Sequence, residues 1–277
     1  MTKKKETFII QRKTEDPIIG DIQFSKLSSS PLVIFCHGYK GYKDWGAWNL
    51  VSDEFVKNDI SFCKFNFSLN GGTLDNPIDF PDLDAFGRNT YSTEVKDVLS
   101  VVNYTKDKYK DYFSCDNIIL IGHSRAGGIV LLSANNAISK VVSWAGVSDF
   151  ASRFPDKDKL KQWKKENVIH ILNARTEQQM PHYYSFYEDF IKNKDNLNIK
   201  KAVNNLQKPF LIVQGTKDEA VLEKEAHELH SWCNNSELYL LNTNHTFGSS
   251  HPWKEAELPS KLLEVVHFTI NFINKEH

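Results

Sequence analysis

Short apolar runs alternate along the chain with longer segments that are apolar on one side only. The runs at 32–36, 117–121, 141–145 and 210–214 are almost entirely apolar, which is typical of strands buried on both faces of a parallel sheet. The segment at 92–108 instead carries its apolar residues at helical spacing. This alternation predicts an α/β fold with a mostly parallel central sheet flanked by helices.

The remaining elements complete the alternation. We expect further strands at 7–13, 21–25, 60–67 and 237–241, and further helices at 45–57, 127–135, 219–232 and 254–274. After the sixth predicted strand, residues 149–207 interrupt the pattern with a charged stretch followed by an aromatic-rich one. We interpret this segment as a cap inserted over one end of the sheet. Because no linker rich in Gly, Ser or Pro divides the chain, we predict a single domain over residues 1–277.

Composition narrows the class of protein. The 277 residues include 34 Lys and Arg against 35 Asp and Glu, a net charge of −1, so neither nucleic acid nor an anionic membrane is the expected partner. The four cysteines lack C-x-x-C spacing, and we expect Cys36 and Cys63 to be buried free thiols, as in a reducing compartment. The basic start at 1–5 precedes an apolar run too short for a signal peptide, and no run approaches a membrane span. We therefore expect a cytoplasmic protein.

The sequence GHSRAGG at 122–128 joins a buried strand directly to a helix. A turn this sharp holds its central residue, Ser124, in a strained conformation and requires small residues on either side. It would lift the hydroxyl above the sheet, where a nucleophile is needed. The alternative is that Ser124 only caps the helix. Ala126 stands where the G-x-S-x-G pattern has its last glycine, and His123 is expected to point away from Ser124.

A serine hydroxyl needs a base to remove its proton and a carboxylate to orient that base. Asp218 and His245 directly follow the strands predicted at 210–214 and 237–241. The carboxyl ends of parallel strands gather functional groups at one edge of a sheet, and the order serine, acid, histidine is that of this arrangement. We therefore assign Asp218 as the acid and His245 as the base.

Other residues could take these roles. Asp149 follows the strand at 141–145 and is the rival acid, while His251 is the rival base. Asp218 could also serve only to cap the next helix. His227 and His230 lack the H-E-x-x-H spacing of a zinc site and are expected on a solvated helix face. No metal or cofactor site is predicted.

The third requirement is a pair of donors for the negative charge of a tetrahedral intermediate. His37 and Gly38 follow the strand at 32–36, and the glycine gives a flexible turn. The next backbone N–H, that of Tyr39, can then face the site. We predict an oxyanion hole formed by the backbone N–H groups of Tyr39 and Arg125.

Taken together, these motifs make the chain resemble the α/β-hydrolase superfamily, in the esterase and dienelactone-hydrolase-like branch that is related to prolyl-oligopeptidase-type catalytic domains. The residues that carry the resemblance are HGYKG at 37–41, GHSRAGG at 122–128, GTKD at 215–218 and NHTF at 244–247. The resemblance covers nearly the whole chain. It implies the α/β-hydrolase fold with Ser124 as nucleophile, His245 as base and Asp218 as acid. It also implies an oxyanion hole at Tyr39 and Arg125.

Fold and triad do not determine the substrate. We expect a carboxylesterase that cleaves small or medium acyl esters through an acyl-serine intermediate, with a small-molecule ester as its partner. A peptidase or thioesterase of the same fold is the alternative, and a non-catalytic ligand-binding protein is the third. The peptidase is less favoured because no propeller-sized domain precedes the motifs.

Two regions should shape the pocket. They are the long loop at 67–89 and the cap, whose aromatic cluster at 180–187 either lines the pocket or anchors the cap. Arg153 and Arg175 could bind a substrate carboxylate, but we expect both to form structural ion pairs.

Overall fold

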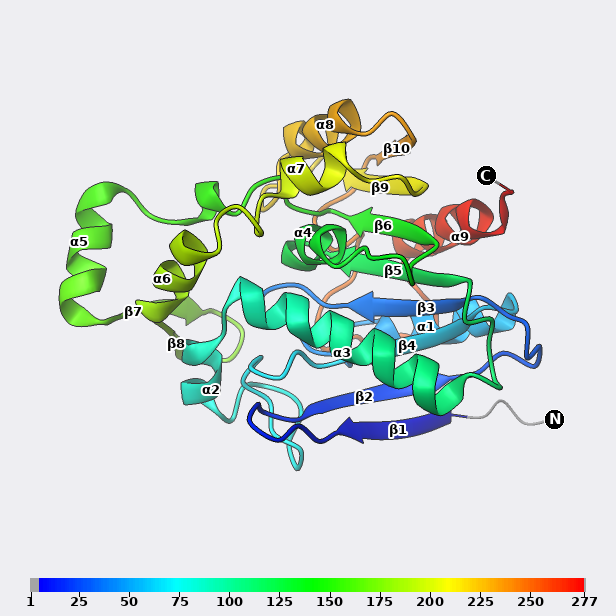
Figure 1. The fold of residues 1–277 in the computed structure, drawn as a ribbon, viewed down its shortest axis with the longest axis horizontal. Helices are drawn as coiled ribbons and strands as arrows, with labels where there is room; N and C mark the ends of the chain where they lie inside the picture. Colours follow the sequence, from blue (N-terminus) through cyan, green and yellow to red (C-terminus); the bar gives the residue numbers. More distant parts are fainter. Residues whose placement is uncertain (1–4, 277) are drawn as a thin grey trace.

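The central sheet contains eight strands in the order β1-β2-β4-β3-β5-β6-β9-β10 (Figure 1). They are β1 (Lys5–Ile10), β2 (Ile18–Gln23), β3 (Leu32–Cys36), β4 (Ser61–Phe65), β5 (Ile118–His123), β6 (Lys140–Trp144), β9 (Phe210–Gly215) and β10 (Ser236–Leu241). β2 is antiparallel to both neighbours, and the other neighbouring pairs are parallel. This computed structural model, which describes residues 5–276, confirms the mostly parallel sheet.

Helices cover both faces of this sheet. One face carries α3 (Tyr91–Tyr109), α4 (Arg125–Leu132) and α8 (Glu223–Trp232), and the other carries α1 (Trp48–Lys57) and α9 (Ser260–Asn274). Side chains of β5 alternate between the two cores: Ile118 and Leu120 enter the first, Ile119 and Ile121 the second. All four are fully buried, and each such side chain contributes about 1.5–3 kcal/mol. Burial on both faces explains the continuous apolar run.

Several helices begin later than their periodicity predicts. α1 begins at Trp48, α8 at Glu223 and α9 at Ser260, because the residues before them form loops. Pro259 precedes α9, and proline is well tolerated where a helix N-terminus would leave its N–H unpaired. The predicted loop at 67–89 also contains a short helix, α2 (Leu83–Arg88), whose six residues are too few to show a periodicity.

The inserted segment forms a hairpin with helices on either side. Its elements are the 3-10 turn Ala151–Arg153, α5 (Lys157–Glu166), β7 (Val168–Asn173), β8 (Gln178–Tyr183), α6 (Ser185–Lys192) and α7 (Ile199–Asn204). Figure 1 shows α5, β7, β8 and α6 beyond the arrowheads of β3, β5 and β6. α7 instead packs against α4 and α8. The overhanging part of the predicted cap therefore ends before α7, and it covers the carboxyl edge of the sheet.

Other expectations about the chain concern its ends and its thiols. No helix within residues 5–276 is both long and apolar enough to cross a membrane. Residues 1–4, most of the basic start, lie outside the described residues. All four cysteines are free, and both Cys36 and Cys63 are buried, which confirms the thiols predicted at these two positions.

Candidate active site

Ser124 lies in the sharp turn between β5 and α4, with φ 59° and ψ −123°. Glycine is required two residues earlier, because a Cβ on Gly122 would lie 2.1 Å from the carbonyl oxygen of Ala126. A Cβ on Gly127 would likewise lie 2.6 Å from Cα of Gly146. The Ser124 hydroxyl makes no capping hydrogen bond to α4. The interpretation of Ser124 as a simple N-cap is therefore wrong, and the strained backbone serves to present the hydroxyl.

Asp218 and His245 form a hydrogen-bonded pair at the same edge of the sheet. Nδ1 of His245 lies 2.7 Å from Oδ2 of Asp218, and the carboxylate is fully buried. The other oxygen, Oδ1, accepts the backbone N–H groups of Ala220 and Val221 at 2.8 and 2.9 Å. Burial alone would raise the pKa of Asp218, but the contact with His245 and these amides hold that pKa below its usual value. Asp218 therefore both fixes a turn and orients His245, while α8 begins only at Glu223.

Ser124 and His245 line the same cavity. Within residues 5–276 the Ser124 hydroxyl has no hydrogen-bond partner, so the contact needed for proton transfer to His245 is not closed in this conformation. Such contacts often tighten only when a substrate is bound. The structure thus brings the three predicted side chains to one edge and leaves one contact to be completed.

The two predicted oxyanion donors flank Ser124. A Cβ on Gly38 would lie 2.9 Å from Cβ of Ser124, so only glycine lets this loop approach the serine. Among the hydrogen bonds of residues 5–276, the backbone N–H groups of Tyr39 and Arg125 have no acceptor. Both amides are therefore free to bind a developing negative charge.

His37 orients one of these amides. Its Nε2 accepts the backbone N–H of Phe67 at 3.3 Å, so Nδ1 carries the proton and donates to the Gly38 carbonyl at 2.9 Å. The Gly38 carbonyl and the Tyr39 N–H belong to one planar peptide group and point in opposite directions. Holding the carbonyl therefore directs the N–H.

His123 has a positioning role that the sequence did not reveal. Its ring centre lies 4.9 Å from that of His245, and its Nε2 donates to the backbone carbonyl of His245 at 3.0 Å. Burial lowers the pKa of His123 to about 3, so the neutral ring acts as a donor at neutral pH. The residue before the candidate nucleophile thus anchors the loop that carries the candidate base.

The rival residues occupy structural positions. The Asp149 carboxylate caps the 3-10 turn by accepting the backbone N–H groups of Ala151 and Ser152. His251 contacts the Tyr42 hydroxyl at 2.7 Å and accepts a backbone N–H on its other nitrogen. Neither joins the Asp218–His245 pair. His227 and His230 lie exposed on α8, as predicted.

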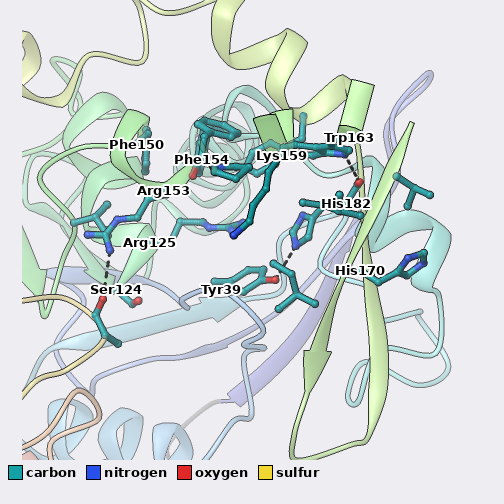
Figure 2. A pocket seen from close by; sticks show the side chains of 18 of the residues that line it. Tyr39, Ser124, Arg125, Phe150, Arg153, Phe154, Lys159, Trp163, His170 and His182 are labelled. Carbon is teal, nitrogen blue, oxygen red and sulfur yellow. Dashed lines mark hydrogen bonds between the residues drawn. The ribbon is translucent and has the colours of Figure 1, made fainter. Parts of the chain in front are cut away.

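A cavity of 990 Å³ opens at Ser124 beneath the cap (Figure 2). Its walls come from the sheet edge and from α5, β7, β8 and α6. The lining residues include Tyr39, Tyr91, Ser124, Arg125, Phe150, Arg153, Phe154, Lys159, Trp163, His182, Phe186 and His245. A smaller cavity of 280 Å³, lined in part by Trp45 and Arg175, also reaches Ser124 and His245. A substrate bound at Ser124 could place its two halves in these two spaces.

The aromatic cluster of the cap divides between two roles. His182 and Phe186 line the large cavity, whereas Met180 is buried in a separate cluster with Phe80. Within the cap, Trp163 links α5 to β8 by donating from Nε1 to the His182 carbonyl at 2.8 Å, a contact drawn in Figure 2. Both interpretations of the cluster are therefore correct for part of it: His182 and Phe186 line the pocket, and Met180 anchors the cap against the body.

Comparisons with known proteins place this site in context. The sequence model of the prolyl oligopeptidase family matches residues 83–275. An uncharacterized peptidase of Bacillus subtilis, YtmA, is 27% identical over 125 residues, which are 42% of this chain and 43% of that protein. The matched region thus spans less than half of that relative's length.

Solved structures match nearly the whole chain. Est1E from Butyrivibrio proteoclasticus has a TM-score of 0.68 at 17% identity, over 97% of this chain and 99% of that one. Alpha/beta hydrolase domain-containing protein 10 from mouse has a TM-score of 0.68 at 17% identity, over 97% of each chain. The esterase Pf2001 of Pyrococcus furiosus has a TM-score of 0.62 at 17% identity, over 98% and 90%. At these identities the structures establish the α/β-hydrolase fold, as the sequence predicted, and not the reaction.

Proposed function

The chain belongs to the prolyl oligopeptidase family and is a serine hydrolase in this general sense; we propose that it cleaves carboxylic esters through an acyl-serine intermediate. The observation that carries the proposal is the Asp218–His245 pair, 2.7 Å apart, whose histidine lines the same cavity as Ser124. A hydrogen-bonded acid and histidine beside a serine in a strained turn is the arrangement that acyl transfer requires.

The proposed reaction has two steps. Oγ of Ser124 attacks the ester carbonyl while Nε2 of His245 takes the serine proton, and the backbone N–H groups of Tyr39 and Arg125 bind the resulting oxyanion. His245 then returns the proton to the leaving alcohol as the C–O bond breaks. A water molecule attacks the acyl-serine in the same manner and releases the acid. Asp218 holds the imidazole in the required tautomer throughout.

The lining of the large cavity supports an ester with a compact, partly aromatic acyl group. Aromatic rings from the body, such as Tyr91 and Phe150, face others from the cap, such as Phe154 and Phe186. Est1E, one of the structurally similar proteins, has been solved with ferulic acid bound, and an aromatic acid of that kind would suit these walls. The substrate side of the proposal is therefore a small-molecule ester.

Hydrolysis of a p-nitrophenyl ester series from acetyl to dodecanoyl tests this proposal. We expect activity that peaks at one acyl length and that falls by about 10⁴–10⁶ in Ser124→Ala. A fluorophosphonate probe should label the wild-type protein and not this variant. A Ser124→Ala protein that keeps most of its activity would remove Ser124 from the mechanism.

Peptide hydrolysis is the second candidate, favoured by the family match and by the description of YtmA as a peptidase. It uses the same three side chains, with an amine as the leaving group. Dipeptidyl and prolyl p-nitroanilides, assayed beside the esters, separate the two reactions. Labelling of Ser124 together with cleavage of anilides alone would favour the peptidase.

A further inference from the structure

The side chain of Arg125 lines the large cavity beside Ser124 and is only 16% exposed. Within residues 5–276 its guanidinium makes one side-chain hydrogen bond, from Nη1 to Oε1 of Glu94 at 3.3 Å. A guanidinium carries five N–H donors, so most of them have no acceptor in the described protein. None of its nitrogens is among the atoms sealed inside without a partner. The free donors therefore face the cavity.

Three aromatic rings hold this guanidinium in place. Its central carbon lies 4.2 Å from the ring centre of Tyr39, 5.4 Å from that of Tyr91 and 5.7 Å from that of Phe186. The Tyr39 hydroxyl is itself bonded to Nε2 of His182 at 2.7 Å, and Figure 2 shows Arg125 extending over Tyr39 between Ser124 and His182. Cation–π contacts orient a guanidinium without using its N–H groups. The donors are thus positioned in advance and left available.

Arg153, the other arginine of the large cavity, differs in this respect. Arg153 also lines the large cavity, but Nη2 binds both carboxylate oxygens of Glu225 and Nη1 donates to the Ala220 carbonyl at 3.3 Å. Arg175 makes one side-chain hydrogen bond, to Asp79 at 2.6 Å, and it lines the smaller cavity. Both are structural ion pairs, as predicted from the sequence. Of the two arginines that line the large cavity, Arg125 is the one whose partner leaves most of its donors unused.

The charge of Arg125 is also poorly compensated. Glu94 is 3% exposed, and its Oε2 has no partner among the described residues. Burial raises the pKa of Glu94 above its usual value, and its ion pair with Arg125 is long, at 3.3 Å. Lys159 faces the same cavity and forms no ion pair within residues 5–276. A buried cation with unused donors is costly unless a ligand supplies the missing acceptor.

We propose that Arg125 is a specificity-determining residue that binds a carboxylate on the substrate, so that the preferred substrates are acidic esters whose carboxylate occupies the large cavity. A planar carboxylate fits the fork of a guanidinium through two parallel hydrogen bonds. The proposal rests on the proposed function, because the ester bond is assumed to lie at Ser124. It assigns to the Arg125 side chain a role separate from that of its backbone N–H.

Matched pairs of esters test the proposal. Monomethyl succinate, glutarate, adipate and terephthalate are compared with methyl butanoate, pentanoate, hexanoate and 4-methylbenzoate, in which a methyl group replaces the carboxylate. O-acetylglycolate is compared with ethyl acetate to test an ester whose carboxylate is on the leaving group. We expect kcat/KM for at least one acidic ester to exceed that of its neutral partner by about tenfold or more, the effect of a charged hydrogen bond.

Arg125→Gln should lower this acidic-to-neutral ratio by about 10- to 100-fold, because any change at the backbone N–H affects both esters alike while only the acidic ester loses the guanidinium. Arg153→Gln is the matched control, because that arginine lines the same cavity with its donors already used, and the ratio should not change. If Arg125→Gln folds poorly with Glu94 left unpaired, the double variant Arg125→Gln/Glu94→Gln removes both charges and should show the same loss.

The proposal is overturned if no acidic ester is preferred by the wild-type protein, or if the preference survives both Arg125 variants. Failure of the proposed function looks different, since neither kind of ester would then be cleaved and the serine probe would not label Ser124. In that case, calorimetric binding of the monoesters to Ser124→Ala still tests Arg125. The inference is contradicted if the acidic esters bind no more tightly than the neutral ones.

Discussion

The two walls of the large cavity are built in different ways. The wall at the sheet edge carries Ser124, Asp218 and His245 on loops that directly follow β5, β9 and β10, and backbone hydrogen bonds and close glycine contacts hold it. The cap wall is a hairpin and two helices joined to the body by side-chain contacts, such as those of His182 with Tyr39 and of Tyr183 with Asp84. Backbone contacts thus fix the first wall, whereas side chains of the cap form much of the second wall.

This difference suggests that the sheet-edge wall serves the chemical step and the cap wall serves substrate binding, which experiments can test. Substitutions in the sheet-edge wall should lower kcat, because they disturb contacts made in the transition state. Substitutions in the cap should act mainly on KM, because they change binding that substrate and transition state share.

Asp218→Asn should lower kcat by about 10⁴. The amide is nearly isosteric but would favour the wrong tautomer of His245, whose Nδ1 now lies 2.7 Å from Oδ2. The measurement is kcat on the preferred p-nitrophenyl ester, with circular dichroism to check the fold. Asp149→Asn is the control, since that carboxylate caps an exposed turn. A larger loss in Asp149→Asn than in Asp218→Asn would reverse the assignment of the acid.

Gly38→Ala should lower kcat by about 10²–10³. The added methyl would lie 2.9 Å from Cβ of Ser124 and 3.1 Å from the backbone oxygen of His123. The loop must then retreat and withdraw the Tyr39 N–H from the oxyanion. Steady-state kinetics together with serine-probe labelling check this, because Ser124 should stay reactive. A variant with unchanged kcat would exclude Tyr39 as an oxyanion donor.

Trp163→Phe should raise KM by about threefold to tenfold and change kcat by about twofold or less. Phenylalanine keeps an aromatic ring in a position that is 1% exposed, but it leaves the His182 carbonyl without the donor that now lies 2.8 Å away. The acyl-length profile should also broaden as the cap loosens. If kcat fell and KM held steady, the proposed division between the walls would be wrong.

Acid should destabilise the protein through its buried histidines. Burial lowers the pKa of His37 to about 4 and that of His123 to about 3. Below the ordinary value of about 6.5, the unfolded chain binds protons that these folded rings do not, so stability falls as the pH drops from about 6.5 towards 4. Asp97, whose pKa burial raises to about 6, opposes part of this loss.

Urea unfolding at pH 7, 6 and 5 measures that dependence. We expect His123→Asn to be less stable at pH 7 and to have a shallower pH dependence than the wild type, by up to about 1.4 kcal/mol per pH unit. An unchanged slope in the variant would show that His123 does not carry the effect.

Much of the sheet and its motifs could be predicted from the sequence, because the signals are local. Strands β3 and β5 are buried on both faces, so their apolar runs mark them directly. The order of the motifs then places Asp218 and His245 at one edge. The helix α2 and the hairpin β7–β8 could not be predicted from the sequence, because α2 has only six residues and β7 is largely exposed. Without burial on one face, a strand carries no hydrophobic alternation.

The sequence by itself determined the fold class, the family and the positions of the three candidate side chains. It could do so because a buried strand followed by a glycine-bounded turn is a pattern of adjacent residues. Only the tertiary structure decided what surrounds them. Tyr39 meets His182 across 143 positions, His123 reaches the carbonyl of His245 across 122, and Arg125 has Glu94 as a partial partner across 31. The hydrogen-bond partners of a buried side chain are set by how distant segments pack together. No local sequence pattern encodes those partners.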